Sequence, residues 1–270
     1  MDAAWLREHH ARPDVRVIDL RWYLDGRSGR AAYESGHIPG AVFVDLASIS
    51  GTEPGRGRHP LPDAGLFERA MRDAGLSADT TVVVYDDGGG TVAGRLWWML
   101  RYFGHARVSV LDGGIQAWAG ELSTETAVPQ PGDFTAATPR AEMKVDYDDV
   151  RRLGEGTLLL DARAGDRYRG ESEPVDPRPG HIPGALSAPA AGNLTDDRRF
   201  RSPEELRARY AELGVTDGAD VVVYCGSGVS ACHDLLALEV AGLAGARLYP
   251  GSWSDWSNRP DAPAATGREP

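Results

Sequence analysis

The sequence predicts an α/β fold of two tandem domains, each a mainly parallel sheet flanked by helices. The first observation behind this prediction is an internal repeat, because Gly-His-Ile-Pro-Gly-Ala occurs at 36–41 and again at 180–185. The second is a longer parallel between 81–95 and 220–234, where a β-branched run leads into a glycine-rich turn and then an amphipathic stretch. The third is that short apolar runs alternate with stretches of helical periodicity in both halves.

Each copy is expected to contribute four short strands, because four apolar runs per copy are bounded by turn-forming residues. They lie near 15–18, 41–44, 82–85 and 108–111 in the first copy and near 157–160, 185–187, 221–224 and 246–249 in the second. Apolar residues at helical spacing predict helices over 66–74 and 206–213. Ligands of parallel sheets bind outside the carboxyl ends of the strands, and Cys225 follows such an end.

A stretch without periodicity separates the two copies. Pro129, Pro131 and Pro139 fall within it, as is typical of a linker. The expected boundaries are 1–125 for the first domain, 126–143 for the linker and 144–270 for the second domain. A chain of 270 residues has room for two domains of this size.

Composition excludes several classes of protein. The net charge of −11 argues against a nucleic-acid binder or an anionic-membrane binder. No apolar run approaches the ~18 residues of a membrane span, and residues 1–10 lack the apolar segment of a secretory signal. Lys144 is the only lysine, which disfavours P-loop and Schiff-base chemistry. Two cysteines make no disulfide framework and no histidine–cysteine cluster has metal-ligand spacing, so we expect a cytoplasmic protein without a metal site.

The residues around Cys225 predict a reactive cysteine. An apolar run delivers Cys225 to a small loop, and a helix is expected to begin near Val229. Gly226 and Gly228 let the backbone curl, so that successive N–H groups can point at one anion. The helix dipole adds to this effect, and both favour a nucleophilic thiolate. The loop residues expected to contact substrate are Gly226, Gly228, Val229 and Ser230.

Three chemistries use a cysteine in such a loop. Cysteine phosphatases need an arginine six positions after the nucleophile, where this chain has Ala231, which cannot grip a phosphate. Thiol–disulfide exchange through Cys-x-x-Cys needs a second cysteine at position 228, which is glycine. Sulfur transfer remains, in which the thiolate accepts a sulfane sulfur and becomes a persulfide. Cys232 lies among apolar helix residues and is expected to belong to the core.

These motifs resemble the tandem-domain rhodanese family of sulfurtransferases over nearly the whole chain. The resemblance rests on the two Gly-His-Ile-Pro-Gly copies, the strand–cysteine loop and the segment Gly-Ser-Trp-Ser-Asp-Trp at 251–256. Within the family, Cys-Gly-Ser-Gly-Val-Ser-Ala-Cys is most similar to the 3-mercaptopyruvate sulfurtransferase branch. The thiosulfate branch typically has Arg and Lys where this chain has Gly226 and Ser227. The first domain is expected to be non-catalytic, because Asp86 stands at the cysteine position and cannot carry a sulfane sulfur.

The resemblance implies roles for several further residues. Arg167 matches an arginine that holds the carboxylate of mercaptopyruvate, and a planar bidentate donor suits that group. The family's second substrate arginine falls where this chain has Asp176, and Arg178 is the expected substitute.

Two further residues are implied to take part in catalysis. Ser227 matches a serine that relays protons beside the cysteine, and His59 matches a histidine from the N-terminal half. The family often has an acidic residue where this chain has Ala47, which puts a Ser–His–Asp relay in doubt.

The expected reaction moves sulfur from 3-mercaptopyruvate through a Cys225 persulfide to a thiol acceptor, such as thioredoxin or a small thiol, or to cyanide. No metal or organic cofactor is expected. Mercaptopyruvate is favoured because neutral Gly226 and Ser227 leave only Arg167 and the backbone dipoles for anion binding, whereas thiosulfate is a compact dianion. The alternatives are a thiosulfate sulfurtransferase and a non-enzymatic sulfur carrier.

Overall fold

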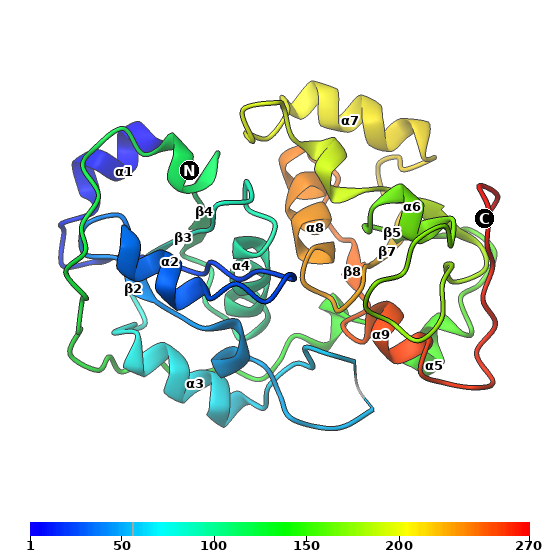
Figure 1. The fold of residues 1–270 in the computed structure, drawn as a ribbon, viewed down its shortest axis with the longest axis horizontal. Coiled ribbons are helices and arrows are strands. Elements are labelled where there is room, and N and C mark those ends of the chain that lie inside the picture. The colour runs from blue at the N-terminus through cyan, green and yellow to red at the C-terminus, as the bar shows by residue number, and fades with distance from the viewer. Residues whose placement is uncertain (56) are drawn as a thin grey trace. The chain divides into compact units, whose positions relative to one another are not determined.

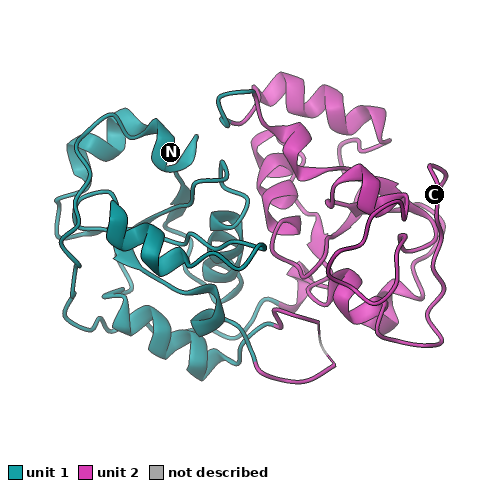
Figure 2. Ribbon diagram, viewed as in Figure 1, with its two compact units in different colours: residues 1–51, 61–140, 196–199 teal, residues 52–60, 141–195, 200–270 magenta. Residues whose placement is uncertain are grey.

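The computed structural model describes residues 1–55 and 57–270, which form two compact units (Figure 2). Unit 1 consists of residues 1–51, 61–140 and 196–199, and unit 2 of residues 52–60, 141–195 and 200–270. The expected boundaries follow chain order, whereas the units exchange two short segments, 52–60 and 196–199. Most of the expected linker packs on unit 1, where Phe134 is buried and its N–H donates to the carbonyl of Leu76 at 3.0 Å.

Unit 1 is a four-stranded parallel sheet in the order β2-β1-β3-β4 (Figure 1). Its strands are β1 (Val15–Asp19), β2 (Val42–Phe43), β3 (Thr81–Tyr85) and β4 (Val108–Val110). Its helices are α1 (Ala3–His9), α2 (Gly29–Ser35), α3 (Ala64–Asp73) and α4 (Ala93–Tyr102), with 3₁₀ turns η1 (Leu46–Ile49) and η2 (Gly114–Ala117). All four strands lie where the apolar runs predict them.

Unit 2 repeats the topology with the order β6-β5-β7-β8, again parallel throughout. Its strands are β5 (Thr157–Asp161), β6 (Ala185–Ser187), β7 (Asp220–Tyr224) and β8 (Arg247–Leu248). Its helices are α5 (Tyr147–Val150), α6 (Gly165–Tyr168), α7 (Pro203–Glu212), α8 (Ala231–Val240) and α9 (Ser252–Trp256), with 3₁₀ turns η3 (Ala141–Met143) and η4 (Ala190–Asn193). The α/β class and the duplication predicted from sequence are therefore confirmed. Among the described residues, no helix combines the length and apolar character that crossing a membrane requires.

The repeated Gly-His-Ile-Pro-Gly-Ala motif is built the same way in both units. His37 stacks on Tyr33 with ring centroids 3.8 Å apart, and a ring nitrogen lies 2.8 Å from the carbonyl oxygen of Tyr33. His181 and Tyr168 repeat both distances. The two histidines therefore hold loops, as their presence in both copies suggests.

A buried ion pair follows the first strand of each unit. Arg163 donates to Asp161 at 2.6 Å and to the carbonyl of Gly180 at 2.6 Å, which ties the end of β5 to the repeated loop. Arg21 and Asp19 form the equivalent pair in unit 1 at 2.6 Å. Because each pair is buried with further hydrogen bonds to backbone, it fixes loop geometry at the carboxyl edge of the sheet.

Candidate active site

Strand β7 delivers Cys225 to the carboxyl edge of the unit 2 sheet, as the sequence predicts. Five residues separate Cys225 from the first residue of α8, and Gly228 takes φ 73°, a left-handed conformation that suits glycine. The cysteine is buried, and neither Cys225 nor Cys232 forms a disulfide. Cys232 donates from its thiol to the carbonyl of Gly228 at 3.3 Å within α8, which fits the predicted core role.

The turn that begins α9 holds the cysteine loop in place. The Cys225 N–H donates to Ser252 Oγ at 3.1 Å, and the Cys225 carbonyl accepts from the N–H of Trp253 at 2.9 Å. The Gly226 carbonyl accepts from the N–H of Ser254 at 2.9 Å. The segment 251–256, which contributes to the family resemblance, therefore binds the cysteine loop through its backbone and one hydroxyl.

The loop after β3 in unit 1 is the counterpart of the cysteine loop, and it binds a carboxylate through backbone N–H groups. Asp86 follows β3 as Cys225 follows β7, and Gly89 has φ 71°, close to that of Gly228. The four N–H groups that donate to the buried Asp86 carboxylate, at 2.7–2.9 Å, belong to Gly88, Gly90, Val92 and Ala93. We call these four groups the unit 1 anion nest. Burial raises the pKa of Asp86 while the four donors oppose it, and four donors on two oxygens fit the charged form.

Ser227 and His59 meet in unit 2. His59 Nδ1 lies 2.9 Å from Ser227 Oγ, and both residues belong to the same compact unit although 168 positions separate them. His59 comes from the segment 52–60, which Figure 2 colours with unit 2. Ala47 stands at the position where the family often has an acidic residue. It belongs to η1 of unit 1, and its N–H donates to Asp45.

Arg167 is anchored by two carboxylates. Its Nη2 donates to Glu173 at 2.6 Å and to Asp176 at 3.1 Å, and all three side chains are largely buried. Burial raises the pKa of Asp176, an effect that Arg58 and Arg167 oppose and the charge of Glu173 reinforces. Burial also disfavours the charged form of Glu173, but hydrogen bonds from Arg167 and from the backbone outweigh it and lower its pKa.

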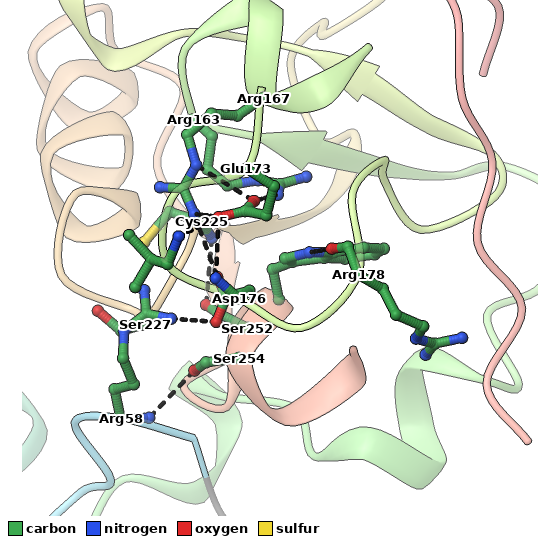
Figure 3. A network of polar contacts seen from close by, with 12 residues as sticks. Arg58, Arg163, Arg167, Glu173, Asp176, Arg178, Cys225, Ser227, Ser252 and Ser254 are labelled. Carbon is green, nitrogen blue, oxygen red and sulfur yellow. Dashed lines mark hydrogen bonds and ion pairs between the residues drawn. The ribbon is translucent and has the colours of Figure 1, made fainter. Parts of the chain in front are cut away.

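Arg178 is not brought to the cysteine loop. Its guanidinium donates to four backbone carbonyls at 2.8–3.0 Å, and in Figure 3 the side chain extends away from Cys225. The four acceptors are Trp256, Ser257, Arg259 and Ala262. The side chain therefore secures the end of α9 and the segment after it, and four of its five N–H donors are used.

Arg58 lies where a second cation was expected. Its Nη1 forms an ion pair with Asp176, and a methyl group placed on Gly226 would lie 2.8 Å from its Nη2. The same methyl group would lie 3.4 Å from Arg167 Nη1, so two guanidinium groups border Gly226. The premise that Arg167 is the only cation near the loop is therefore corrected.

The remaining loop residues are held by α8. Val229 accepts from the Cys232 N–H at 3.0 Å, and Ser230, the residue before the helix, accepts from the N–H of His233 at 3.1 Å. No three His, Cys, Asp or Glu side chains within residues 1–55 and 57–270 gather so that they could bind a metal ion.

Comparisons with known proteins agree with this arrangement. A family model described as the rhodanese-like domain matches residues 2–121 and 147–259. Two such domains with a cysteine loop in the second define a sulfurtransferase of tandem rhodanese type. The chain belongs to the rhodanese family.

Its relatives match over nearly their full lengths. A Pseudomonas aeruginosa protein named as a probable 3-mercaptopyruvate sulfurtransferase is 44% identical, covering 99% of this chain and 98% of the relative. SseB of Mycobacterium tuberculosis, whose name assigns it provisionally to the thiosulfate sulfurtransferases, is 43% identical over 94% of this chain and 91% of its own. The crystal structure of SseA from Escherichia coli, a 3-mercaptopyruvate enzyme with the rhodanese fold, matches with a TM-score of 0.84 at 36% identity, covering 94% of this chain and 98% of SseA.

Proposed function

We propose that this sulfurtransferase takes sulfur from 3-mercaptopyruvate and carries it as a persulfide on Cys225. The observation that carries the proposal is the unit 1 anion nest, in which four N–H groups surround the Asp86 carboxylate. The unit 2 loop likewise follows a strand, has a left-handed glycine (Gly228 at the position of Gly89) and precedes a helix, with Cys225 in place of Asp86; the second left-handed glycine of unit 1, Gly90, is replaced by Val229. Its N–H groups are therefore suited to an anionic sulfur attached to that cysteine.

The proposed reaction balances without a cofactor. The Cys225 thiolate attacks the sulfur of the donor, a sulfur–sulfur bond forms, and the carbon–sulfur bond breaks. The electron pair of that bond passes to the carbon chain as the enolate of pyruvate. The proton of the donor thiol moves to the methylene carbon, which yields pyruvate and an ionised persulfide on Cys225.

Ser227 and His59 are suited to move that proton. The 2.9 Å contact between Ser227 Oγ and His59 Nδ1 links a hydroxyl beside the cysteine loop to an imidazole, a group that can both donate and accept a proton. Arg167 is proposed to hold the donor carboxylate, because bidentate guanidinium–carboxylate contact fixes orientation as well as position.

Discharge requires a thiol, and we propose thioredoxin or a small thiol as acceptor in the cytoplasm. An acceptor thiolate attacks the outer sulfur and releases the Cys225 thiolate. Two free cysteines are compatible with a reducing compartment.

Thiosulfate is the second candidate donor. Its support is that two cations, Arg58 and Arg167, border Gly226 where the sequence indicated one, although the ion pair with Asp176 offsets the charge of Arg58. The name of the M. tuberculosis relative points the same way.

The test compares both donors on one preparation and then on Cys225→Ser. We expect kcat/KM for mercaptopyruvate to exceed that for thiosulfate by at least about tenfold, and Cys225→Ser to remain folded without turnover. Mass spectrometry after donor treatment should find one added sulfur on Cys225, removable by a thiol. An adduct on Cys232 alone, full activity of Cys225→Ser, or equal use of thiosulfate would contradict the proposal.

A further inference from the structure

Two guanidinium groups border the start of the cysteine loop, and only Arg167 was predicted to do so. A methyl group on Gly226 would lie 2.8 Å from Arg58 Nη2 and 3.4 Å from Arg167 Nη1. Contacts at these distances mean that both nitrogen atoms lie against the residue next to Cys225. A side chain at position 226 would displace them, so this glycine leaves room for two cations.

The backbone at Gly57 and Arg58 contacts the turn at 251–254, and this contact positions Arg58 beside Gly226. Its N–H donates to Ser254 Oγ at 3.0 Å, in the turn that also binds the cysteine loop. Gly57 has φ 88°, and a Cβ at this residue would lie 2.6 Å from the carbonyl oxygen of Gly251. Only glycine satisfies both the left-handed conformation and the close approach. Gly57 therefore lets the chain approach the 251–254 turn closely enough to bring Arg58 to this position.

Two carboxylates, Asp176 and Glu173, form ion pairs with Arg58 and Arg167. Asp176 binds Arg58 Nη1 and Arg167 Nη2, and Glu173 binds Arg167 through Nε and Nη2. Among the described residues, no hydrogen bond engages the nitrogen atoms nearest Gly226, which are Arg58 Nη2 and Arg167 Nη1. Arg58 Nε is also buried without a partner in that part of the chain. Donors of both arginines are thus left for a ligand at the loop.

We infer that Arg58 is the second donor-binding cation of this site and that Asp176 positions it. Arg58 and Arg167 together receive the carboxylate of an α-keto thiol, the substrate class of the proposed function on which this inference rests. Glu173 and Asp176 balance the two positive charges, so the four side chains together carry no net charge. Such a set favours a donor with one negative charge over a compact dianion.

The experiment compares Arg58→Met and Arg58→Lys with wild type on two donors. One donor is mercaptopyruvate, and the other is mercaptoacetone, which has the same keto thiol but no carboxylate. Arg58→Met should raise KM for mercaptopyruvate at least tenfold and change kcat/KM for mercaptoacetone less than threefold. Arg58→Lys keeps a positive charge that can pair with Asp176 but loses the planar guanidinium that binds a carboxylate through two hydrogen bonds. Its KM for mercaptopyruvate should therefore lie between those of wild type and Arg58→Met.

A matched control and a second readout separate donor binding from folding. Arg169→Met removes an exposed arginine paired with Glu171 at 2.7 Å in the same unit, and it should leave both donors unaffected. Discharge of a preformed Cys225 persulfide by a thiol should proceed at the wild-type rate in Arg58→Met, because no donor carboxylate is present in that step. Thermal unfolding of each variant verifies the fold.

The charge exchange Arg58→Asp with Asp176→Arg provides a further test. The exchanged pair returns an arginine to the loop, so the double variant should have a lower KM for mercaptopyruvate than Arg58→Asp alone. The inference fails if folded Arg58→Met and Arg58→Lys keep the wild-type KM for mercaptopyruvate, or if both donors lose activity equally. A wild-type protein that does not use mercaptopyruvate would instead reject the proposed function.

Discussion

The hydroxyl of Ser252 accepts a hydrogen bond from the backbone N–H of Cys225 at 3.1 Å and donates to the carbonyl of Tyr249 at 2.9 Å. Ser252 has φ 55°, a left-handed conformation that is unfavourable for a residue with a side chain. Unit 1 places Gly114 at the equivalent position with φ 60°. Unit 2 therefore maintains backbone strain at Ser252 and gains a side-chain acceptor for the backbone of its cysteine loop.

Replacing Ser252 should separate strain from hydrogen bonding. Ser252→Ala keeps the strain and leaves the buried Cys225 N–H without its acceptor, which costs about 1–3 kcal/mol of stability. Ser252→Gly also loses the acceptor but relieves the strain, so it should be more stable than Ser252→Ala by about 1 kcal/mol. Both should lower kcat/KM roughly tenfold. Chemical denaturation and steady-state kinetics test this, and equal stability of the two variants would contradict the strain argument.

The Asp86 carboxylate should stabilise unit 1 through its four N–H donors. Asp86→Asn replaces one acceptor oxygen by an NH₂ group that faces two N–H groups, which should lower the stability of the protein by about 3 kcal/mol. Asp25→Asn, an exposed aspartate paired with Arg27 in the same unit, is the control and should change stability by less than ~0.5 kcal/mol. Thermal unfolding at neutral pH measures both. An Asp86→Asn variant as stable as wild type would show that the nest does not require a charged occupant.

Asp234, in the first turn of α8, should make stability depend on pH. Burial raises its pKa to about 8, although Asn193 and Arg209 oppose the shift. Asn193 Nδ2 donates to Asp234 Oδ1 at 2.7 Å, and Asp234 Oδ2 is buried without a partner among the described residues. Between about pH 4 and pH 8 the folded protein thus keeps a proton that the unfolded chain has lost. This group therefore reduces stability as pH rises through that window, by up to about 1.4 kcal/mol per pH unit.

Asp234→Asn imitates the protonated carboxyl and removes this dependence. Its unfolding midpoint relative to wild type should rise steadily from pH 5 to pH 8 and then level off. Asp217→Asn, at an exposed ion pair with Arg207, should show no such trend. A constant difference between Asp234→Asn and wild type over this range would mean that Asp234 titrates near its ordinary pKa.

The sequence predicted those parts of the structure that depend on residues close together in the chain. Strand β7 and its loop follow from an apolar run, two glycines and a helix, and all three stand together in the sequence. The contact between His59 and Ser227 was implied by the family resemblance, and the structure brings the two together. The role of Ser252 was missed, because a left-handed serine has no sequence signature.

Arg58 could not be predicted in the same way. Its position depends on an ion pair with Asp176, 118 residues away, and on the hydrogen bond from the Arg58 N–H to Ser254. One signal was present, since the family resemblance implies an arginine where this chain has Asp176, and an acid at that position calls for a partner of opposite charge. Arg178 was predicted as the second substrate arginine because it lies two positions after Asp176 in the sequence. Its guanidinium instead donates to backbone carbonyls at and after the end of α9.

Arg178 should therefore affect stability rather than donor binding. Arg178→Met leaves four carbonyl oxygens without their charged donor, which should lower stability by about 3 kcal/mol or more. The KM for mercaptopyruvate of the folded fraction should stay within twofold of wild type. Arg167→Met should show a large rise in KM, at least tenfold. If Arg178→Met raised KM as strongly as Arg167→Met while remaining equally stable, Arg178 would be restored as a substrate ligand.

Donor selectivity should follow the charge at Asp176. Asp176→Asn removes one negative charge beside Arg58 and Arg167, which leaves the four side chains with a net positive charge. A dianion gains more from that change than a monoanion, so the ratio of kcat/KM for mercaptopyruvate to that for thiosulfate should fall about tenfold, equivalent to roughly 1.4 kcal/mol. Mercaptopyruvate itself should bind less well, because Asp176 no longer orients Arg58. Raising the ionic strength should weaken thiosulfate use in Asp176→Asn more than in wild type. An unchanged donor ratio in Asp176→Asn would mean that loop geometry, and not the charge of this cluster, sets the choice of donor.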